Sequence, residues 1–275
     1  MFTRTTGWLI VPLWLAAMTW LVSHDLLPGL TAKDAPPIMP TEWMREEGRQ
    51  SEFSILLANE PIGRIWTTYL VGENSLQRTD LIWISRFPVA VAPLRLVVDS
   101  VFTGEGELDE LTVKLATKKK RFHLHGERFH SDFSFTFDSG PVEQTFKVPL
   151  VEGGLIGGAL SPFAQLTDIE VGQTWRMQMF NPIAALTGMG DRFMPMLIKV
   201  TGEERISTPE GECDCLVIES SHTKAWVDSR GVVMAQQITL PVAGTLRIVR
   251  QPEFDEDGML QARRRSLTRD TRSSP

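Results

Sequence analysis

Apolar and polar side chains alternate with a period of two along much of the chain between Phe53 and Arg250. In one clear stretch, Phe133, Phe135 and Phe137 are separated by single polar residues. Successive side chains of a β-strand point to opposite faces of a sheet, so this period predicts strands with one apolar face and one face in water. Together with turn residues, it predicts strands at 53–58, 62–71, 76–85, 94–102, 111–115, 129–137, 146–148, 174–180, 196–206, 213–220, 223–228, 232–240 and 245–250.

Helical patterns are scarce in the same region. Short segments at 162–166 and 182–186 carry proline or capping signals. The apolar, glycine-rich stretch at 150–160 lacks a period and predicts a connector, with a cover over a cavity mouth as the alternative. Because strands do not alternate with long helices, a parallel α/β fold is disfavoured. The expected fold is mainly β: a large curved antiparallel sheet or open half-barrel with a few short helices.

The first residues have the pattern of an export signal. Arg4 precedes an apolar run from Trp8 to Val22, and further leucines extend it. This length suits a signal sequence and approaches the roughly 20 residues that cross a bilayer. The small residues of a good cleavage site are missing from the sequence that follows. Residues 1–28 are therefore predicted to be an uncleaved signal anchor, a transmembrane helix, with a cleaved signal peptide as the alternative.

Composition divides the rest of the chain. Residues 29–51 combine prolines with mixed charge and predict a tether, and residues 52–250 form the antiparallel β domain. Residues 251–275 are polar without apolar periodicity and predict a disordered tail. Because the positive residue keeps the N-terminus inside, the expected location is the inner (cytoplasmic) membrane, spanned once. The C-terminal domain would then lie in the periplasm or another extracytoplasmic space.

The net charge and the cysteine content limit the partners and the chemical sites that can be expected. A formal net charge of −6 argues against nucleic acid as a partner, and the basic run 118–121 is interpreted as a solvated turn. Cys213 and Cys215 are too few for a disulfide framework or a four-ligand zinc site. They share one strand face, which favours two small packed residues, with a redox or metal role as the alternative.

The sequence contains no recognisable catalytic arrangement. His123 and His125 share a strand face, and His130 follows a turn expected at Gly126–Glu127. A three-histidine metal site, and with it a metal-dependent hydrolase, is therefore an unfavoured alternative. The sequence lacks a nucleophile elbow and a cysteine at a helix start. We predict no catalytic residue, no cofactor and no bound metal.

Three short motifs resemble those of a known group of domains. They are the strand pair in 61–69, the segment 162–166 followed by 171–175, and Trp226-Val227-Asp228 followed by the apolar strand from Gly231. In this order they are similar to bacterial envelope domains of unknown function (DUF3108-like) that resemble the lipoprotein carriers of the LolA/LolB superfamily. The resemblance implies a curved antiparallel sheet closed by short helices. It implies no chemistry, because the motifs are structural.

Apolar side chains on two strands suggest a function. Phenylalanine and methionine surfaces suit adaptable hydrophobic pockets, and the predicted cavity lining is Phe129, Phe133, Phe135, Phe137, Trp175, Met177 and Met179. The leading hypothesis is a non-catalytic, membrane-anchored β domain that binds an apolar ligand or a lipid, unless these residues simply fill the core. The alternative is an accessory subunit that docks on an envelope transporter or enzyme.

Overall fold

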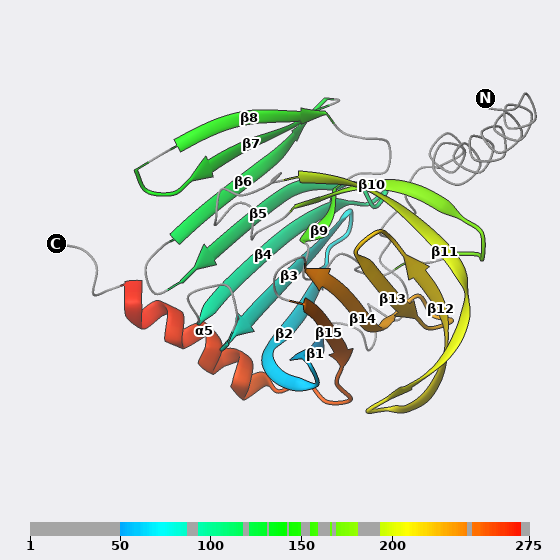
Figure 1. The fold of residues 1–275 in the computed structure, drawn as a ribbon. Helices are drawn as coiled ribbons and strands as arrows, with labels where there is room; N and C mark the ends of the chain where they lie inside the picture. The colour runs from blue at the N-terminus through cyan, green and yellow to red at the C-terminus, as the bar shows by residue number, and fades with distance from the viewer. Residues whose placement is uncertain are drawn as a thin grey trace, which may run out of the picture.

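The computed structural model describes residues 50–86, 93–117, 121–130, 132–141, 143–149, 155–158, 166, 169–180, 193–240 and 244–270. Within them, regular structure is almost entirely β (Figure 1). The elements are β1 (Gln50–Leu57), β2 (Glu60–Val71), β3 (Ser75–Ile84), β4 (Leu94–Thr103), β5 (Leu108–Ala116), β6 (Arg121–Phe129), β7 (Asp132–Asp138), β8 (Glu143–Pro149), β9 (Leu155–Gly158), β10 (Thr174–Phe180), β11 (Phe193–Thr208), β12 (Gly211–Glu219), β13 (Thr223–Val227), β14 (Val233–Leu240), β15 (Gly244–Arg250) and α5 (Glu256–Asp270). The expected mainly β fold is confirmed.

These strands form one open sheet of fifteen strands. Its order is β8-β7-β6-β5-β4-β3-β2-β1-β15-β14-β13-β12-β11-β10-β9. Neighbours pair antiparallel throughout, except that β9 runs parallel to β10. The order consists of two meanders, β1 to β8 and β9 to β15, joined where β1 pairs with β15. The open edges of the sheet are therefore β8 and β9.

Tight turns set the register of the meanders. Ala58 and Asn59 adopt left-handed φ angles of 50° and 66° between β1 and β2. Gly106 lies in the turn between β4 and β5 and Gly231 in the turn between β13 and β14, each with a φ of 81°. Residues with a Cβ rarely adopt a positive φ, which explains why glycine occupies positions 106 and 231. The N–H of each glycine donates to the carbonyl three residues earlier.

Inward side chains of both meanders meet in one apolar core. Along β4 every second residue is buried, from Leu94 to Phe102. The same core cluster contains Ile82 and Phe135 from the first meander and Ile198 from the second. The bending of the sheet in Figure 1 lets the two meanders bury a shared apolar face.

The glycine-rich stretch at 150–160 differs from the connector that its sequence predicts. Residues 155–158 form β9, which pairs with β10. β9 also lies close to β4 of the first meander. The edge of the sheet at β9 therefore lies close to the first meander.

The prediction of a disordered tail at 251–275 is wrong for the residues that are described. Residues 256–270 form α5, whose Ala262 packs with Trp66 and Leu81 in a second apolar cluster. Trp66 and Leu81 point away from the main core, so α5 covers the other face of the sheet. The apolar positions of α5 are too sparse to predict a helix, and packing on the sheet supplies the missing stabilisation.

Polar contacts fix the start of α5. The Asp255 carboxylate accepts the Gly258 N–H at 2.8 Å, as an N-cap does. The Glu52 carboxylate of β1, with only 4% of its surface exposed, accepts the Asp255 N–H at 2.8 Å and the Arg64 guanidinium at 3.1 Å. Arg64 also pairs with the Asp255 carboxylate at 2.8 Å. Glu52 therefore ties the start of α5 to β1 and β2.

The predicted anchor at 1–28 lies outside the described residues, as does the tether up to residue 49. Across the ranges described above, no helix combines the length and the apolar content needed to cross a bilayer. β1 begins at Gln50, so the end of the predicted tether belongs to the sheet. The short helices expected at 162–166 and 182–186 also fall outside, apart from Leu166, which is buried in the core.

Replacing Glu52 with alanine should loosen α5. The substitution leaves the Asp255 N–H without its acceptor and removes one of the two carboxylates that pair with Arg64, and the loss of a buried partner costs about 1–3 kcal/mol. Glu60→Ala removes an exposed carboxylate from the same β1–β2 hairpin and should change stability little. Chemical denaturation measures the free energy of unfolding, and hydrogen exchange of residues 256–264 measures local opening. Equal effects of the two substitutions would contradict the anchoring role.

Candidate functional site

Three of the predicted lining phenylalanines lie together in the core. Phe133, Phe135 and Phe137 alternate along β7 and are buried in the same cluster as Trp175 of β10. The ring centroids of Phe133 and Phe135 are 5.0 Å apart. These four side chains therefore belong to the packed interior between the meanders. Their contact with a ligand stays a prediction.

A turn separates Phe129 from this group. The chain reverses at His130, which has a φ of 57°, and Phe129 pairs with Asp132 across the β6–β7 hairpin. Cross-strand partners share a face, so Phe129 lies on the opposite face from Phe135, the partner of Gly126. Phe129 is 59% exposed. The prediction of one continuous strand over 129–137 is wrong for this reason.

The two methionines of the predicted lining lie in β10. Met177 pairs with Met196 and Met179 with Met194 of β11. The side chains of Met177 and Met179 fall outside the described part of the chain, so their place in a lining stays a prediction.

A glycine makes room for the buried rings. A Cβ built on Gly126 would lie 2.5 Å from a ring carbon of Phe135 and 2.6 Å from one of Phe133. These distances are far below van der Waals contact, so a larger residue would push the rings apart. The sequence suggests a turn at Gly126–Glu127, but both residues lie within β6. Close packing, rather than chain reversal, requires this glycine.

An ion pair is buried on the core face of β3. Arg78 Nε lies 3.0 Å from an Asp80 carboxylate oxygen, and both side chains are almost fully buried. The hydroxyl of Thr67 on β2 donates to Asp80 at 2.5 Å. Burial raises the pKa of Asp80, although Arg78 and Thr67 favour its charged form. Tyr69, which pairs with Arg78 across the strands, is also buried, and burial raises its pKa.

Sequence analysis missed this pair, although a signal exists. Arg78 and Asp80 occupy alternate positions of a strand whose other inward residues, such as Leu76 and Ile82, are apolar. Charged residues in phase with an apolar face indicate burial or function. The pair belongs to the interior, because its side chains are only 4% and 2% exposed.

Other polar atoms of the second meander face the core. Gln236 pairs with Ala225, and Thr223 pairs with Ile238 in the β13–β14 register. Gln236 Nε2 and Thr223 Oγ1 are buried and, among the residues described, have no hydrogen-bond partner. The same holds for Nε1 of Trp175. Such atoms are where water or a polar ligand atom binds within a core.

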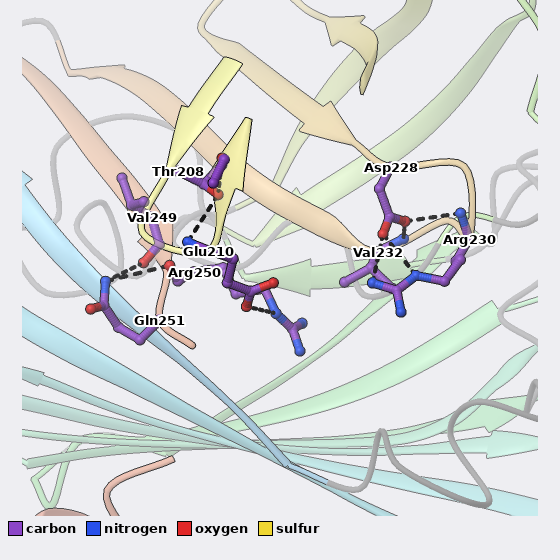
Figure 2. Close-up of polar contacts among 9 residues, drawn as sticks. Thr208, Glu210, Asp228, Arg230, Val232, Val249, Arg250 and Gln251 are labelled. Carbon is purple, nitrogen blue, oxygen red and sulfur yellow. Dashed lines mark hydrogen bonds and ion pairs between the residues drawn. The ribbon is translucent and has the colours of Figure 1, made fainter. Parts of the chain in front are cut away.

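Figure 2 shows how the turns of the second meander are fixed. Glu210, at the tip of the β11–β12 hairpin, accepts the Arg250 guanidinium at 3.3 Å, which ties the tip to the end of β15. In the β13–β14 turn, the buried Asp228 accepts the N–H groups of Arg230 and Val232 and pairs with the Arg230 guanidinium at 3.0 Å. The polar atoms of these residues bond to one another, which indicates a structural role.

A hollow of about 750 Å³ opens where β4, β5, β6 and β7 end on one side of the sheet. We call it the rim groove. Its walls include the cationic Arg95, Lys114 and Arg121, the titratable His123, the acid Asp138 and the apolar Leu115 and Phe122. The basic run 118–121 is thus not wholly a turn, because Arg121 begins β6, while Lys118–Lys120 lie outside the described residues.

The rim groove joins the two faces of the sheet. Lys114 pairs with His123 across β5 and β6, and both point away from the core. One residue along, Leu115 pairs with Phe122, and both pack into the core. Adjacent residues of a strand face opposite ways, so the strand ends present a cationic wall next to an apolar wall.

The electrostatics of the rim groove favour an anion. Partial burial lowers the pKa of His123, Lys114 and His125 lower it further, and Asp138 opposes them. An anion between these side chains would offset the repulsion among the cations. Sequence reasoning missed the groove because its residues come from four strands.

The histidines that the sequence suggests as a metal site are engaged elsewhere. His125 contacts the Thr112 hydroxyl at 3.0 Å through Nδ1 and the Glu127 carboxylate at 2.9 Å through Nε2. His130 lies in the β6–β7 turn, with its ring centroid 4.5 Å from that of Phe129. No group of three or more potential metal ligands occurs within the described ranges.

Comparison with known proteins identifies no family. No protein-family model and no curated protein matches the chain. Among solved structures, it is similar to the crystal structure of a beta-barrel-like protein of the domain of unknown function DUF1849 from Brucella abortus. The two share 9% identity with a TM-score of 0.45, over 80% of this chain and 98% of that chain. The resemblance to lipoprotein carriers stays a prediction.

Gly126→Ala should destabilise the fold by about 1–3 kcal/mol, because the added methyl overlaps the rings of Phe133 and Phe135. The control is Gly202→Ala in β11, where an added Cβ meets no atom within 4 Å. Denaturant unfolding measures both. Combining Gly126→Ala with Phe133→Leu should recover part of the loss, since one of the two clashing rings is gone. Similar costs at both glycines would show that the rings do not pack as described.

Removing one partner of the buried ion pair should cost more than removing both. Arg78→Met leaves a buried carboxylate unpaired, at about 3–5 kcal/mol, whereas Arg78→Met with Asp80→Leu should cost far less. The deficit of the single variant should shrink as pH falls, because Asp80 has a raised pKa in the folded state and protonation removes its charge.

An exposed ion pair provides the matched control. Arg205 and Asp214 are bonded at 2.6 Å with both side chains mostly in water. Arg205→Met should therefore cost at most about 1 kcal/mol. Denaturant unfolding at several pH values measures all three variants and the wild type. A double variant at 78 and 80 as unstable as the single one would refute this account.

Proposed function

We propose that this protein is a non-catalytic binding domain, tethered to a membrane, that holds an anionic lipid in the rim groove. The observation that carries the proposal is the hollow of about 750 Å³ with one cationic and one apolar wall. A lipid with an anionic headgroup has the two matching parts, a charged end and an apolar end. This proposal retains the lipid-binding hypothesis and adds polar contacts to the lipid at the ends of β4 to β7.

The cationic wall suits a phosphate headgroup. Lys114 and Arg121 come from neighbouring strands, and Arg95 lies across β4 and β5 from them. Charged hydrogen bonds from guanidinium and ammonium groups to phosphate oxygens are stronger than neutral ones. Asp138 is the acid in this wall, and it lies opposite His123 in the register of β6 and β7.

The apolar wall leads from the groove into the core. Phe122 stacks on Phe137, with their ring centroids 5.7 Å apart, and Leu115 packs in the same cluster. The first methylenes of an acyl chain would lie on Leu115 and Phe122. Phe137 belongs to the lining that the sequence predicts, so this path connects the groove to the phenylalanine group of β7.

A membrane tether would keep the domain near its ligand. Residues 1–28 carry the predicted anchor, and residues 29–49 would reach at most about 70 Å if fully extended. The domain could then meet lipids of the extracytoplasmic leaflet without leaving the inner membrane. Anchoring and an extracytoplasmic location are part of the proposal and rest on the sequence.

Docking on an envelope transporter or enzyme is the second candidate. One observation favours it: β8 is an open edge of the sheet, with Glu143 and Lys147 exposed. A partner strand could pair with this edge, although exposed charges on edge strands usually oppose such pairing. The hydrolase alternative gains nothing from the positions of the histidines.

Binding of short-chain phosphatidylglycerol to the full-length protein in neutral detergent tests the main proposal. Lys114→Gln should weaken binding about fivefold, because one cation near an anionic lipid contributes about 1 kcal/mol. The control is Lys199→Gln, which removes an exposed lysine of β11 and should leave affinity unchanged. Native mass spectrometry or calorimetry provides the affinities.

Two further probes separate headgroup from chain. Short-chain phosphatidylcholine should bind more weakly, since its headgroup has no net charge, and inorganic phosphate should bind more weakly still. Binding of phosphatidylglycerol should tighten as pH falls below the ordinary pKa of histidine, because His123 has a lowered pKa and becomes cationic only there. Equal binding of both lipids, or no effect of Lys114→Gln, would refute the role of the groove.

A further inference from the structure

The two cysteines lie in sulfur contact on the face of the sheet opposite the core. Cys213 Sγ and Cys215 Sγ are 3.3 Å apart, and the Cys215 thiol donates to Cys213. Both are free thiols. Extended backbone places residues two apart at a Cα distance of roughly 6.5–7 Å, near the upper limit for a disulfide. The sulfur contact shows that the local conformation nevertheless turns the side chains toward each other.

The surroundings of the two thiols differ. Cys215 is only 2% exposed and packs with Val217, Trp226 and Met234 in an apolar cluster. Cys213 packs against the edge of this cluster and is partly exposed. A molecule arriving from solvent therefore meets Cys213 first, and the Cys215 sulfur lies 3.3 Å from the Cys213 sulfur. This arrangement of an accessible and a resolving thiol is the one that disulfide exchange needs.

We propose that Cys213 and Cys215 form a redox-active dithiol that reduces a disulfide of a small molecule or a partner protein. In the first step, the Cys213 thiolate attacks one sulfur of the substrate disulfide, and the other substrate sulfur leaves as a thiolate. The product of this step is a mixed disulfide on Cys213. One S–S bond breaks as one forms.

Cys215 completes the reaction. Its thiol loses a proton, its sulfur attacks Cys213 Sγ, and the substrate's second sulfur leaves as a thiolate. The sulfurs move from 3.3 Å to the covalent distance of about 2.05 Å. Overall the protein dithiol is oxidised by two electrons, the substrate disulfide is reduced to two thiols, and the two thiol protons pass to the products.

Burial and charge suit these roles. Burial raises the pKa of the Cys215 thiol, the hydrogen bond to Cys213 raises it further, and Asp228 and Asp214 act in the same direction. Cys215 is therefore the less readily oxidised of the two thiols. This inference is independent of lipid binding, because β12 lies in the other meander from the rim groove.

Oxidation of the reduced full-length protein by oxidised glutathione tests the inference. The chain has no cysteines besides these two, so thiol counting is unambiguous. The wild type should lose both alkylatable thiols and two hydrogens of mass, with no glutathione retained. Cys215→Ser should stop at one glutathione adduct on Cys213. Cys213→Ser should react at least about tenfold more slowly than Cys215→Ser, because its remaining thiol is buried and protonated.

Acid quenching, alkylation and intact mass measurement distinguish the outcomes. A wild type that keeps one glutathione as Cys215→Ser does would show that Cys215 does not resolve the mixed disulfide. Two thiols still open to alkylation, or covalent dimers in their place, would equally overturn the inference. Circular dichroism of both serine variants checks that they fold, and the wild-type result decides the question even where a variant does not.

Discussion

The structure depends on the burial of one apolar face of the sheet, which is shared by both meanders. Strands such as β4 and β7 alternate buried and partly exposed side chains, and α5, the helix described, lies on the opposite face from the main core. Among the described residues, the apolar face is therefore covered by the sheet itself. The two meanders do this by bending toward each other from the β1–β15 junction, with β9 returning close to β4. Curvature follows from burial.

The same alternation decides where chemistry can occur. A polar residue in phase with the core loses contact with water, and a partner inside offsets that loss, as Arg78 and Thr67 do for Asp80. A polar residue out of phase reaches water. Cationic and apolar surfaces meet where the strands end, because adjacent residues such as Lys114 and Leu115 line one hollow there. An amphipathic site at the rim is therefore a consequence of the sheet's construction.

Much of the fold could be predicted because a period of two is a local property. The strand expected at 174–180 matches β10 to the residue, and most others differ only at their ends. Predictions failed where distant contacts decide. Phe129 does not share a face with the phenylalanines of β7, because the turn at His130 interrupts the alternation between the two strands. α5 forms because Trp66 and Leu81 offer it a surface, and the rim groove brings together residues from four strands.

The thiol pair and the rim groove lie in different meanders and depend on different parts of a strand. The groove needs strand ends, where charge and apolar surface adjoin, whereas the thiols need a strand interior, where Cys215 is shielded and Cys213 is reached. A disulfide across one intervening residue closes a very small loop and restricts the unfolded chain little. Its formation would thus add little stability, so the contact of the sulfurs at 3.3 Å fits electron transfer better than reinforcement of the sheet.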